Sequence, residues 1–183
     1  MLLGKNRDQK YSGSYEQVAK IIYAVTTEKV QSMEQFYKTV VMSYLLKNGD
    51  AHLKNFGVLY DSGFNNIRFA PAYDIVNTTA YIFKDKPALT MFGKKVWWGK
   101  SELIQFGVEH CFLSHSCSVH AYKECLDALY EMKKELKEYV KHNRAFKDIA
   151  IKMIDSWDLS IEGNTHKEIP IETIRDWKKN KRV

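Results

Sequence analysis

Apolar side chains recur at helical spacing through the first quarter of the chain and predict two amphipathic helices. Ser14 and Ser32 are each followed three residues later by a glutamine, Gln17 and Gln35, which is the capping-box pattern of a helix N-terminus. The first predicted helix covers "SYEQVAKIIYAV". The second has its apolar stripe at Phe36, Val40, Val41, Tyr44 and Leu45. Gly49 is the predicted stop of this second helix.

The pattern then shortens to two apolar runs, "FGVLY" (56–60) and "IRFAPAYDI" (67–75), joined by "DSGFNN". Two such runs around a turn rich in Asp, Gly and Asn predict a β-hairpin. A second strand pair is predicted through "ALTMFGKKVWW" (88–98). Helical periodicity returns beyond Lys100, over 101–109, 118–139, 144–157 and a last turn or two at 171–179. The sequence therefore predicts a single mainly α domain over residues 1–183, with a small β-hairpin element.

Composition narrows the class of protein without deciding its function. Hydrophobic residues make up 45% and charged residues 27% of the chain, as in ordinary globular proteins. No window has the length of unbroken apolar sequence that a membrane span needs, and no signal peptide is evident, so a cytoplasmic protein is expected. The three cysteines do not suggest a disulfide framework. The net charge of +6 favours anionic partners, although the basic tail "KKNKRV" is better explained as solvated surface.

A polar cluster follows the second predicted helix and continues beyond the hairpin. Asp50 and Asn55 have the spacing of the base and the metal-binding Asn in the kinase catalytic loop, H-R-D-x-x-x-x-N. Asp74 comes after the hairpin, as the second metal-binding Asp does in kinases. Lys54 could place a charge against the transferring phosphate, and His52 could brace the loop or assist the base. The pattern favours magnesium-dependent phosphoryl transfer from ATP.

Each of these acids also has a purely structural interpretation. Asp50 could cap backbone N–H groups after Gly49, and Asp74 could be a turn residue after Pro71. Either alone would more often be structural than catalytic. Two acids and an Asn at kinase-like intervals around one hairpin shift the balance toward the catalytic interpretation.

The stretches that carry these residues, "NGDAHLKNFGVLY" and "FAPAYDIVNTT", resemble the C-terminal kinase lobe of the HipA-like toxin serine/threonine kinases. The shared pattern is N-x-D-x-H-x-K-N, an aliphatic strand, and L-x-P-x-Y-D, with Phe69 here in place of the Leu. "LLGKNRDQKYSGSYEQVAKII" and "ALTMFGKK" also resemble family segments. The resemblance implies a protein-kinase-like C-lobe that uses ATP and Mg²⁺. Asp50 would be its base, Asn55 and Asp74 its nucleotide and metal ligands, and His52 and Lys54 the rest of its catalytic loop.

The same resemblance implies partners. In the family the acceptor is a protein hydroxyl, with aminoacyl-tRNA synthetases the known kind of target, and a DNA-binding antitoxin holds the kinase in check. DNA is therefore expected to be contacted only indirectly.

An N-terminal kinase lobe is not apparent in these 183 residues. None of the nine glycines forms a G-x-G pair, and two predicted helices fill most of the chain before Asp50. Two explanations stay open. The chain is one part of a kinase whose N-lobe comes from elsewhere, or it is a non-catalytic remnant that binds an antitoxin, a partner lobe or DNA. Retention of Asp50, Asn55 and Asp74 favours the first.

Three other groups of residues have more than one interpretation. "EHCFLSHSCSVH" invites a zinc site but lacks ligand spacing typical of zinc; its candidates are His110, Cys111, His115, Cys117 and His120. "GKKVWWGK" could stack single-stranded nucleic acid, but tryptophans packed on a helical core are the favoured interpretation. Leu126, Tyr130 and Leu136 are predicted helix core.

Overall fold

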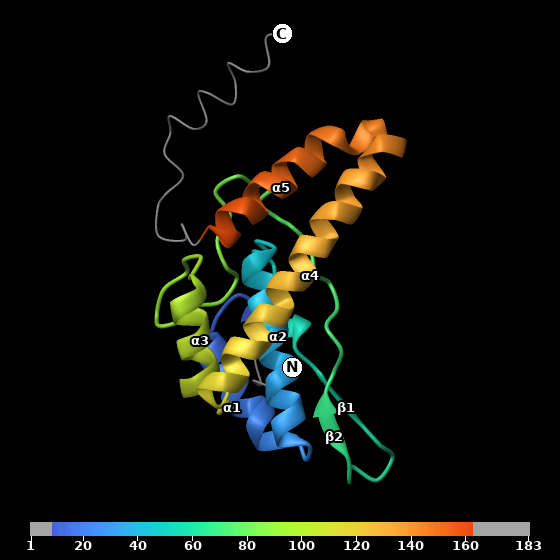
Figure 1. Ribbon diagram of the computed structural model, residues 1–183. Coiled ribbons are helices and arrows are strands. Elements are labelled where there is room, and N and C mark those ends of the chain that lie inside the picture. Colours follow the sequence, from blue (N-terminus) through green and yellow to red (C-terminus); the bar gives the residue numbers. More distant parts are fainter. Residues whose placement is uncertain (1–8, 163–183) are drawn as a thin grey trace.

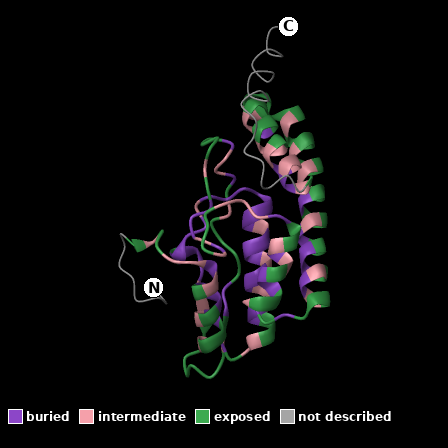
Figure 2. Ribbon diagram, turned by 90° about the vertical axis from the view of Figure 1, so that its left-hand side faces the viewer, coloured by how far each residue is buried: buried purple, intermediate pink, exposed green. Residues whose placement is uncertain are grey.

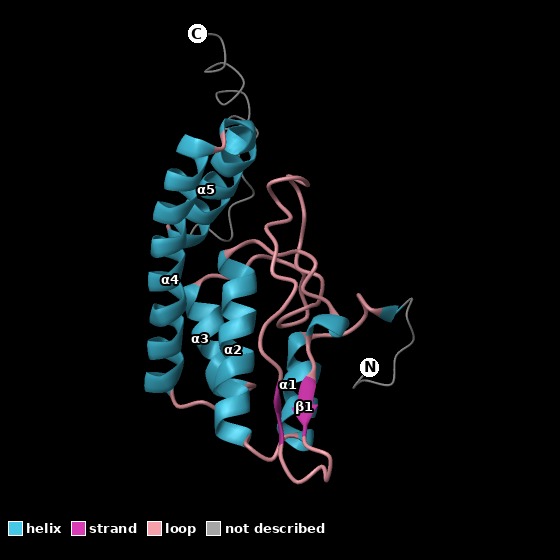
Figure 3. Cartoon of the chain, turned by 90° about the vertical axis from the view of Figure 1, so that its right-hand side faces the viewer, coloured by secondary structure: helices cyan, strands magenta, loops and turns pink. Residues whose placement is uncertain are grey.

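Helices dominate residues 9–162, which the computed structural model describes, and one two-stranded antiparallel sheet accompanies them (Figures 1 and 3). The elements are α1 (Tyr15–Val25), α2 (Lys29–Leu45), η2 (Leu53–Asn55), β1 (Val58–Tyr60), β2 (Ile67–Phe69), α3 (Lys100–Glu109), α4 (His115–His142), η3 (Arg144–Phe146) and α5 (Lys147–Ile161). Helix α4 runs beside α2 and α3, and α5 folds back along its C-terminal half. The predicted mainly α fold with a small hairpin is confirmed. No helix in the described part of the chain is long and apolar enough to cross a lipid bilayer.

The capping box predicted at the first helix is confirmed, and the second is wrong. The Ser14 hydroxyl accepts a hydrogen bond from the Gln17 N–H at 3.2 Å, and the Ser14 N–H donates to the Gln17 side chain at 3.3 Å. Helix α2 already begins at Lys29, so Ser32 lies inside it. The Ser32 hydroxyl accepts instead from the Phe69 N–H at 3.1 Å and joins β2 to α2. A contact between distant segments therefore replaces the predicted local cap.

The hairpin is confirmed, with Val58 opposite Phe69 and Tyr60 opposite Ile67. Its inner end packs on α2, where the ring of Phe69 lies 5.7 Å from that of Phe36. At its outer end Tyr60 stacks on Phe64 with 4.5 Å between ring centroids. The sheet therefore lies along the helical body, with its buried end beside α2 and its outer end joined to Thr27, whose N–H donates to the Ile67 carbonyl at 2.8 Å (Figure 1).

The second predicted strand pair is wrong, because residues 88–98 form only isolated bridges, between Ser14 and Thr90 and between Met91 and Lys94. The indole N–H of Trp97 donates to the Asp85 carbonyl and that of Trp98 to the Met91 carbonyl, both at 3.0 Å. Both rings pack against the core. The bulky side chains anchor a folded loop, which supports the core-packing interpretation of this segment.

The hydrophobic core centres on α2, and burial concentrates where the helices face one another (Figure 2). The buried apolar residues of α4 are Ala121, Tyr122, Cys125 and Leu129, none of them in its last three turns. Of the predicted α4 stripe, Leu126 and Leu136 pack at the edge of the core. Tyr130 is 42% exposed, so its assignment to the core was wrong. Tyr130 lies one position after the buried Leu129 and faces away from the core.

The C-terminal helices extend beyond their predicted limits. Helix α4 begins at His115, where the Ser114 hydroxyl caps it by accepting from the Cys117 N–H at 3.1 Å. The predicted helix over 144–157 divides into the short turn η3 and helix α5. Trp157 on α5 is buried in the core and fastens this helix to the domain. The predicted last turn at 171–179 lies outside the described residues.

Candidate functional site

The loop that follows α2 turns sharply and is almost entirely buried. Helix α2 ends at Leu45, and Lys47 adopts the left-handed conformation with a φ of 57°. The predicted stop at Gly49 was therefore misplaced. Between residues 46 and 56 only Asp50 and Lys54 are not buried. The loop thus presents one carboxylate and one ammonium to the surroundings while its other side chains anchor it.

Gly49 is needed in this loop for close approach. A Cβ atom at Gly49 would lie 2.1 Å from a carboxylate oxygen of Asp85 and 2.8 Å from the Lys86 carbonyl oxygen. The Gly49 N–H also donates to the Thr78 hydroxyl at 2.8 Å, and that hydroxyl donates to the Lys47 carbonyl at 3.1 Å. Thr78 therefore fastens the loop to the segment that follows Asp74.

Asn55 and Asp74, 19 positions apart in the chain, meet directly. The Asn55 side-chain amide donates to Asp74 Oδ2 at 2.9 Å. Its carbonyl oxygen accepts from the His52 N–H, also at 2.9 Å. The Asp74 carboxylate can only accept a hydrogen bond and the His52 N–H can only donate one, so the two contacts fix the orientation of the Asn55 amide. The structure thus brings the two predicted metal ligands together.

Asn48 links Asp50 to the same group, although the sequence reasoning gave it no role. Its side-chain carbonyl accepts from the Asp50 N–H at 3.1 Å, and its amide donates to the Asp74 carbonyl at 3.4 Å. Asn48 is buried, and both bonds are partly buried. The signal for it was its place as the first residue of the N-x-D-x-H-x-K-N pattern.

Asp74 itself has a strained backbone, with a φ of 57°. Such a conformation costs a non-glycine residue about 1 kcal/mol or more and is often found at functional sites. The neighbouring Tyr73 hydroxyl donates to the Lys54 carbonyl and ties the post-hairpin segment to the loop. Burial and the negative charge of Asp74 raise the pKa of Tyr73, so its phenol stays protonated and able to donate.

The remaining predicted loop residues differ in their surroundings. His52 is buried, and its main chain carries hydrogen bonds of the η2 turn, with its N–H donating to the Asp50 carbonyl at 2.8 Å. Its ring packs edge-on against Tyr11 at 5.3 Å. Lys54 is exposed on η2.

Asp74 offers an oxygen ligand to a magnesium ion, whereas the Asn55 side-chain oxygen already accepts from the His52 N–H and keeps one lone pair for a cation. Mg²⁺ prefers oxygen donors and keeps several waters, so two protein side chains suffice to hold it beside a nucleotide. Asp74 Oδ2 accepts the hydrogen bond from Asn55, and the other carboxylate oxygen, Oδ1, takes no part in that bond. The second carboxylate oxygen of Asp74 and the remaining lone pair of the Asn55 oxygen would therefore fit a magnesium ion that keeps several waters.

Lys10 and Tyr11, which the sequence reasoning also missed, lie on the same site. The Tyr11 hydroxyl donates to Asp50 Oδ1 at 2.6 Å. The Lys10 ammonium lies 4.6 Å from the Tyr11 ring centroid, and contact with Tyr11 and the charges of Asp50 and Asp74 raise its pKa. No sequence motif near residue 10 predicts the contact between Tyr11 and Asp50, because the two residues are about forty positions apart.

Lys47 provides a stability prediction at this loop. It is buried with its ammonium 5.0 Å from the Trp97 ring centroid, and burial lowers its pKa from 10.5 to about 8. The unfolded chain therefore binds more protons between these values, so burying this lysine destabilises the fold below pH 8 and progressively less above it. Raising the pH from 7 to 10 should stabilise the wild type relative to Lys47→Met by roughly 2–3 kcal/mol.

Urea unfolding of both proteins at the two pH values measures this difference, and Lys20→Met on the exposed face of α1 is the matched control. If the difference in unfolding free energy between wild type and Lys47→Met stays constant with pH, Lys47 is charged to the same extent in the folded and unfolded states.

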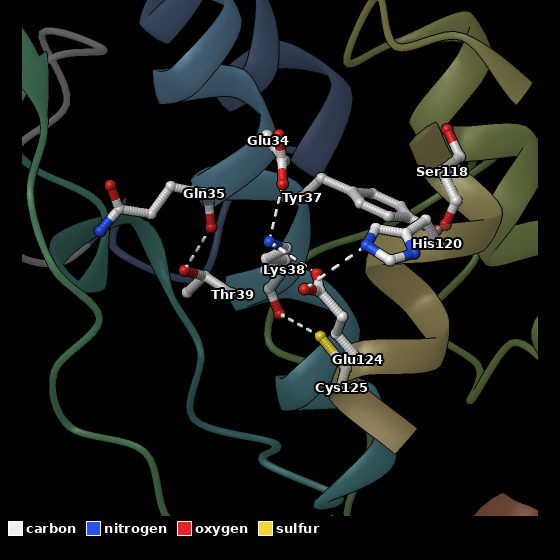
Figure 4. Close-up of polar contacts among 9 residues, drawn as sticks. All are labelled: Glu34, Gln35, Tyr37, Lys38, Thr39, Ser118, His120, Glu124 and Cys125. Carbon is white, nitrogen blue, oxygen red and sulfur yellow. Dashed lines mark hydrogen bonds and ion pairs between the residues drawn. The ribbon is translucent and has the colours of Figure 1, made fainter. Parts of the chain in front are cut away.

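The histidines and cysteines of the zinc hypothesis do not converge. Figure 4 shows His120 directed at Glu124 (3.6 Å), which in turn pairs with Lys38 of α2 at 2.8 Å. The Cys125 thiol faces the Lys38 carbonyl in the same interface. Within residues 9–162 no three His, Cys, Asp or Glu side chains are grouped to hold a metal ion. Glu124 and Cys125 join α4 to α2, while His120 pairs with Glu124 within α4.

Comparison with known proteins identifies a matching family and relatives of parts of this chain. The sequence model described as the HipA-like C-terminal domain matches residues 1–154. A protein of Haemophilus influenzae named "Putative kinase" is 34% identical over 74 residues, which are 40% of this chain and 21% of that protein. "Putative kinase Y4dM" of Sinorhizobium fredii is 31% identical over 88 residues, 48% of this chain and 21% of that protein. The matched segments thus span about a fifth of these relatives.

A solved structure shares the fold. It is the HipA of Shewanella oneidensis, determined with HipB and operator DNA. The TM-score is 0.54 at 16% sequence identity, and the match covers 85% of this chain and 41% of that one.

Proposed function

Because the chain belongs to the family of HipA-like C-terminal domains, we propose that it is the C-terminal catalytic part of a toxin serine/threonine protein kinase. The observation that carries this proposal is the direct Asn55–Asp74 contact, tied to Asp50 through Asn48. Three positions that the kinase spacing singled out thus belong to one hydrogen-bonded group.

The roles proposed for the residues follow from their surroundings. Asp50 is a partly exposed carboxylate that can accept the hydrogen bond and proton of an acceptor hydroxyl. Asn55 and Asp74 would hold Mg²⁺ through their side-chain oxygens, and Lys54 would place its charge near the phosphates. His52 keeps the loop in shape through its main chain and its contact with Tyr11. When bound, Mg·ATP supplies the phosphoryl group and neutralises its charge.

The partners are proposed from the family resemblance and from the structural relative. A protein hydroxyl would be the acceptor, with an aminoacyl-tRNA synthetase the kind of target that the resemblance implies. The Shewanella HipA was solved with HipB and operator DNA, and we propose a comparable antitoxin here, through which DNA would be reached indirectly. A nucleotide-covering N-lobe would complete the site, from a separate polypeptide or a further part of the same protein.

Calorimetric titration with Mg·ATP tests the proposal. The 183-residue chain alone should bind weakly, with a dissociation constant well above micromolar, because most adenine and phosphate contacts of a kinase come from the N-lobe. Addition of the polypeptide that carries the N-lobe should tighten binding and allow phosphate transfer to a protein hydroxyl. Absence of nucleotide binding in every such assembly would favour the non-catalytic binding module instead.

A further inference from the structure

The phenol of Tyr11 contacts Asp50, the proposed catalytic base. Its hydroxyl donates to Asp50 Oδ1 at 2.6 Å, a short distance typical of a hydrogen bond to a carboxylate. The two residues are 39 positions apart, so the contact depends on the tertiary fold. A hydroxyl within about 2.6–3.2 Å is at the distance from which a carboxylate can be oriented or a proton transferred.

The segment that carries Tyr11 is attached to the catalytic loop by one hydrogen bond and to the loop over 88–98 by another. The Leu53 N–H of η2 donates to the Lys10 carbonyl at 3.1 Å, and the Lys95 ammonium donates to the Tyr11 carbonyl at 3.2 Å. The Tyr11 ring meets the buried His52 ring edge-on. Although Tyr11 is 44% exposed, three contacts of its own and the bond to the neighbouring Lys10 carbonyl hold it in place.

The bond to Asp50 leaves room for a substrate. A carboxylate has two oxygens, and Tyr11 occupies Oδ1, so Oδ2 can meet an acceptor hydroxyl while Oδ1 is held. The Asp50 main chain is fixed from the other side, by the bond from its N–H to Asn48. Tyr11 thus restricts the rotation of the Asp50 carboxylate, and Asn48 fixes the position of the Asp50 backbone. Small errors in the orientation of a base can lower a rate substantially.

We infer that Tyr11 is a positioning residue that orients the Asp50 carboxylate toward the acceptor hydroxyl. The inference rests on the proposed phosphoryl transfer, whereas the contact between the two side chains is a property of the fold. The opposite role, in which Tyr11 blocks the place of the acceptor, predicts the opposite effect on rate.

Tyr11→Phe separates these roles, because it removes the hydroxyl and keeps the ring against His52. In the assembly that restores activity, kcat should fall about 10- to 100-fold, the range for loss of one hydrogen bond to a charged group. The KM for Mg·ATP should be unchanged. Tyr60→Phe is the matched control, since Tyr60 is an exposed tyrosine of the hairpin whose stacking on Phe64 survives the change.

A second measurement needs no activity. In the isolated 183-residue chain, the ¹³C carboxyl resonance of Asp50 should shift in Tyr11→Phe and stay in place in Tyr60→Phe. An unmoved resonance, or a kcat equal to or above that of wild type, overturns the inference. A wild type that is inactive in every assembly overturns the proposed kinase function instead, and the Asp50 resonance still decides whether Tyr11 holds the carboxylate.

Discussion

Asp50→Asn is expected to lower phosphoryl transfer by about 10²- to 10⁴-fold while leaving the affinity for Mg·ATP nearly unchanged. Asparagine keeps the size of the side chain and can still accept the hydrogen bond from Tyr11. It cannot take the proton of the acceptor hydroxyl. Because the Asp50 carboxylate acts on the acceptor hydroxyl rather than on the nucleotide, its loss should lower kcat alone.

Radiolabelled phosphate transfer measures the rate, and calorimetry measures the affinity, in the assembly that restores activity. Asp127→Asn on the exposed surface of α4 is the matched control. Transfer by Asp50→Asn at the wild-type rate would remove Asp50 from the mechanism.

Asp74→Asn is expected to weaken magnesium-dependent nucleotide binding by roughly tenfold or more and to lower turnover as well. The change removes a negative charge from the proposed metal site and replaces a charged acceptor for the Asn55 amide by a neutral one. Binding measured without magnesium should be the same in both proteins, because the lost charge is felt through the ion.

A titration of magnesium at fixed ATP concentration, followed by the same titration with chelator present, provides the measurement. If Asp74→Asn binds Mg·ATP as wild type does, Asp74 has a structural role in the turn and no metal role.

The parts of the fold that the sequence predicted correctly are encoded in short windows. The capping box of α1 needs residues 14–17 only, and the hairpin needs two apolar runs and the turn between them. The family resemblance, also carried by contiguous motifs, is confirmed.

The errors and omissions share a physical cause, which is that tertiary contacts overrode local patterns. Ser32 has a capping pattern, but its hydroxyl serves Phe69, 37 positions away. Lys47 takes the left-handed turn expected of Gly49, and Gly49 lies instead where the chain passes close to Asp85. Tyr11 reaches Asp50 across 39 positions. None of these contacts leaves a periodic or spaced signal in a single sequence.

The most direct test of the proposed site uses Mn²⁺ in place of Mg²⁺, because its unpaired electrons broaden the NMR signals of nearby nuclei. Titration of the 183-residue chain with Mn·ATP should broaden the side-chain resonances of Asn55 and Asp74 first, and Asp74→Asn should greatly reduce the effect. Weak binding does not prevent this measurement. Broadening confined to other residues, such as the histidines of α4, with Asn55 and Asp74 unaffected, would contradict the assignment of this site to a metal–nucleotide complex.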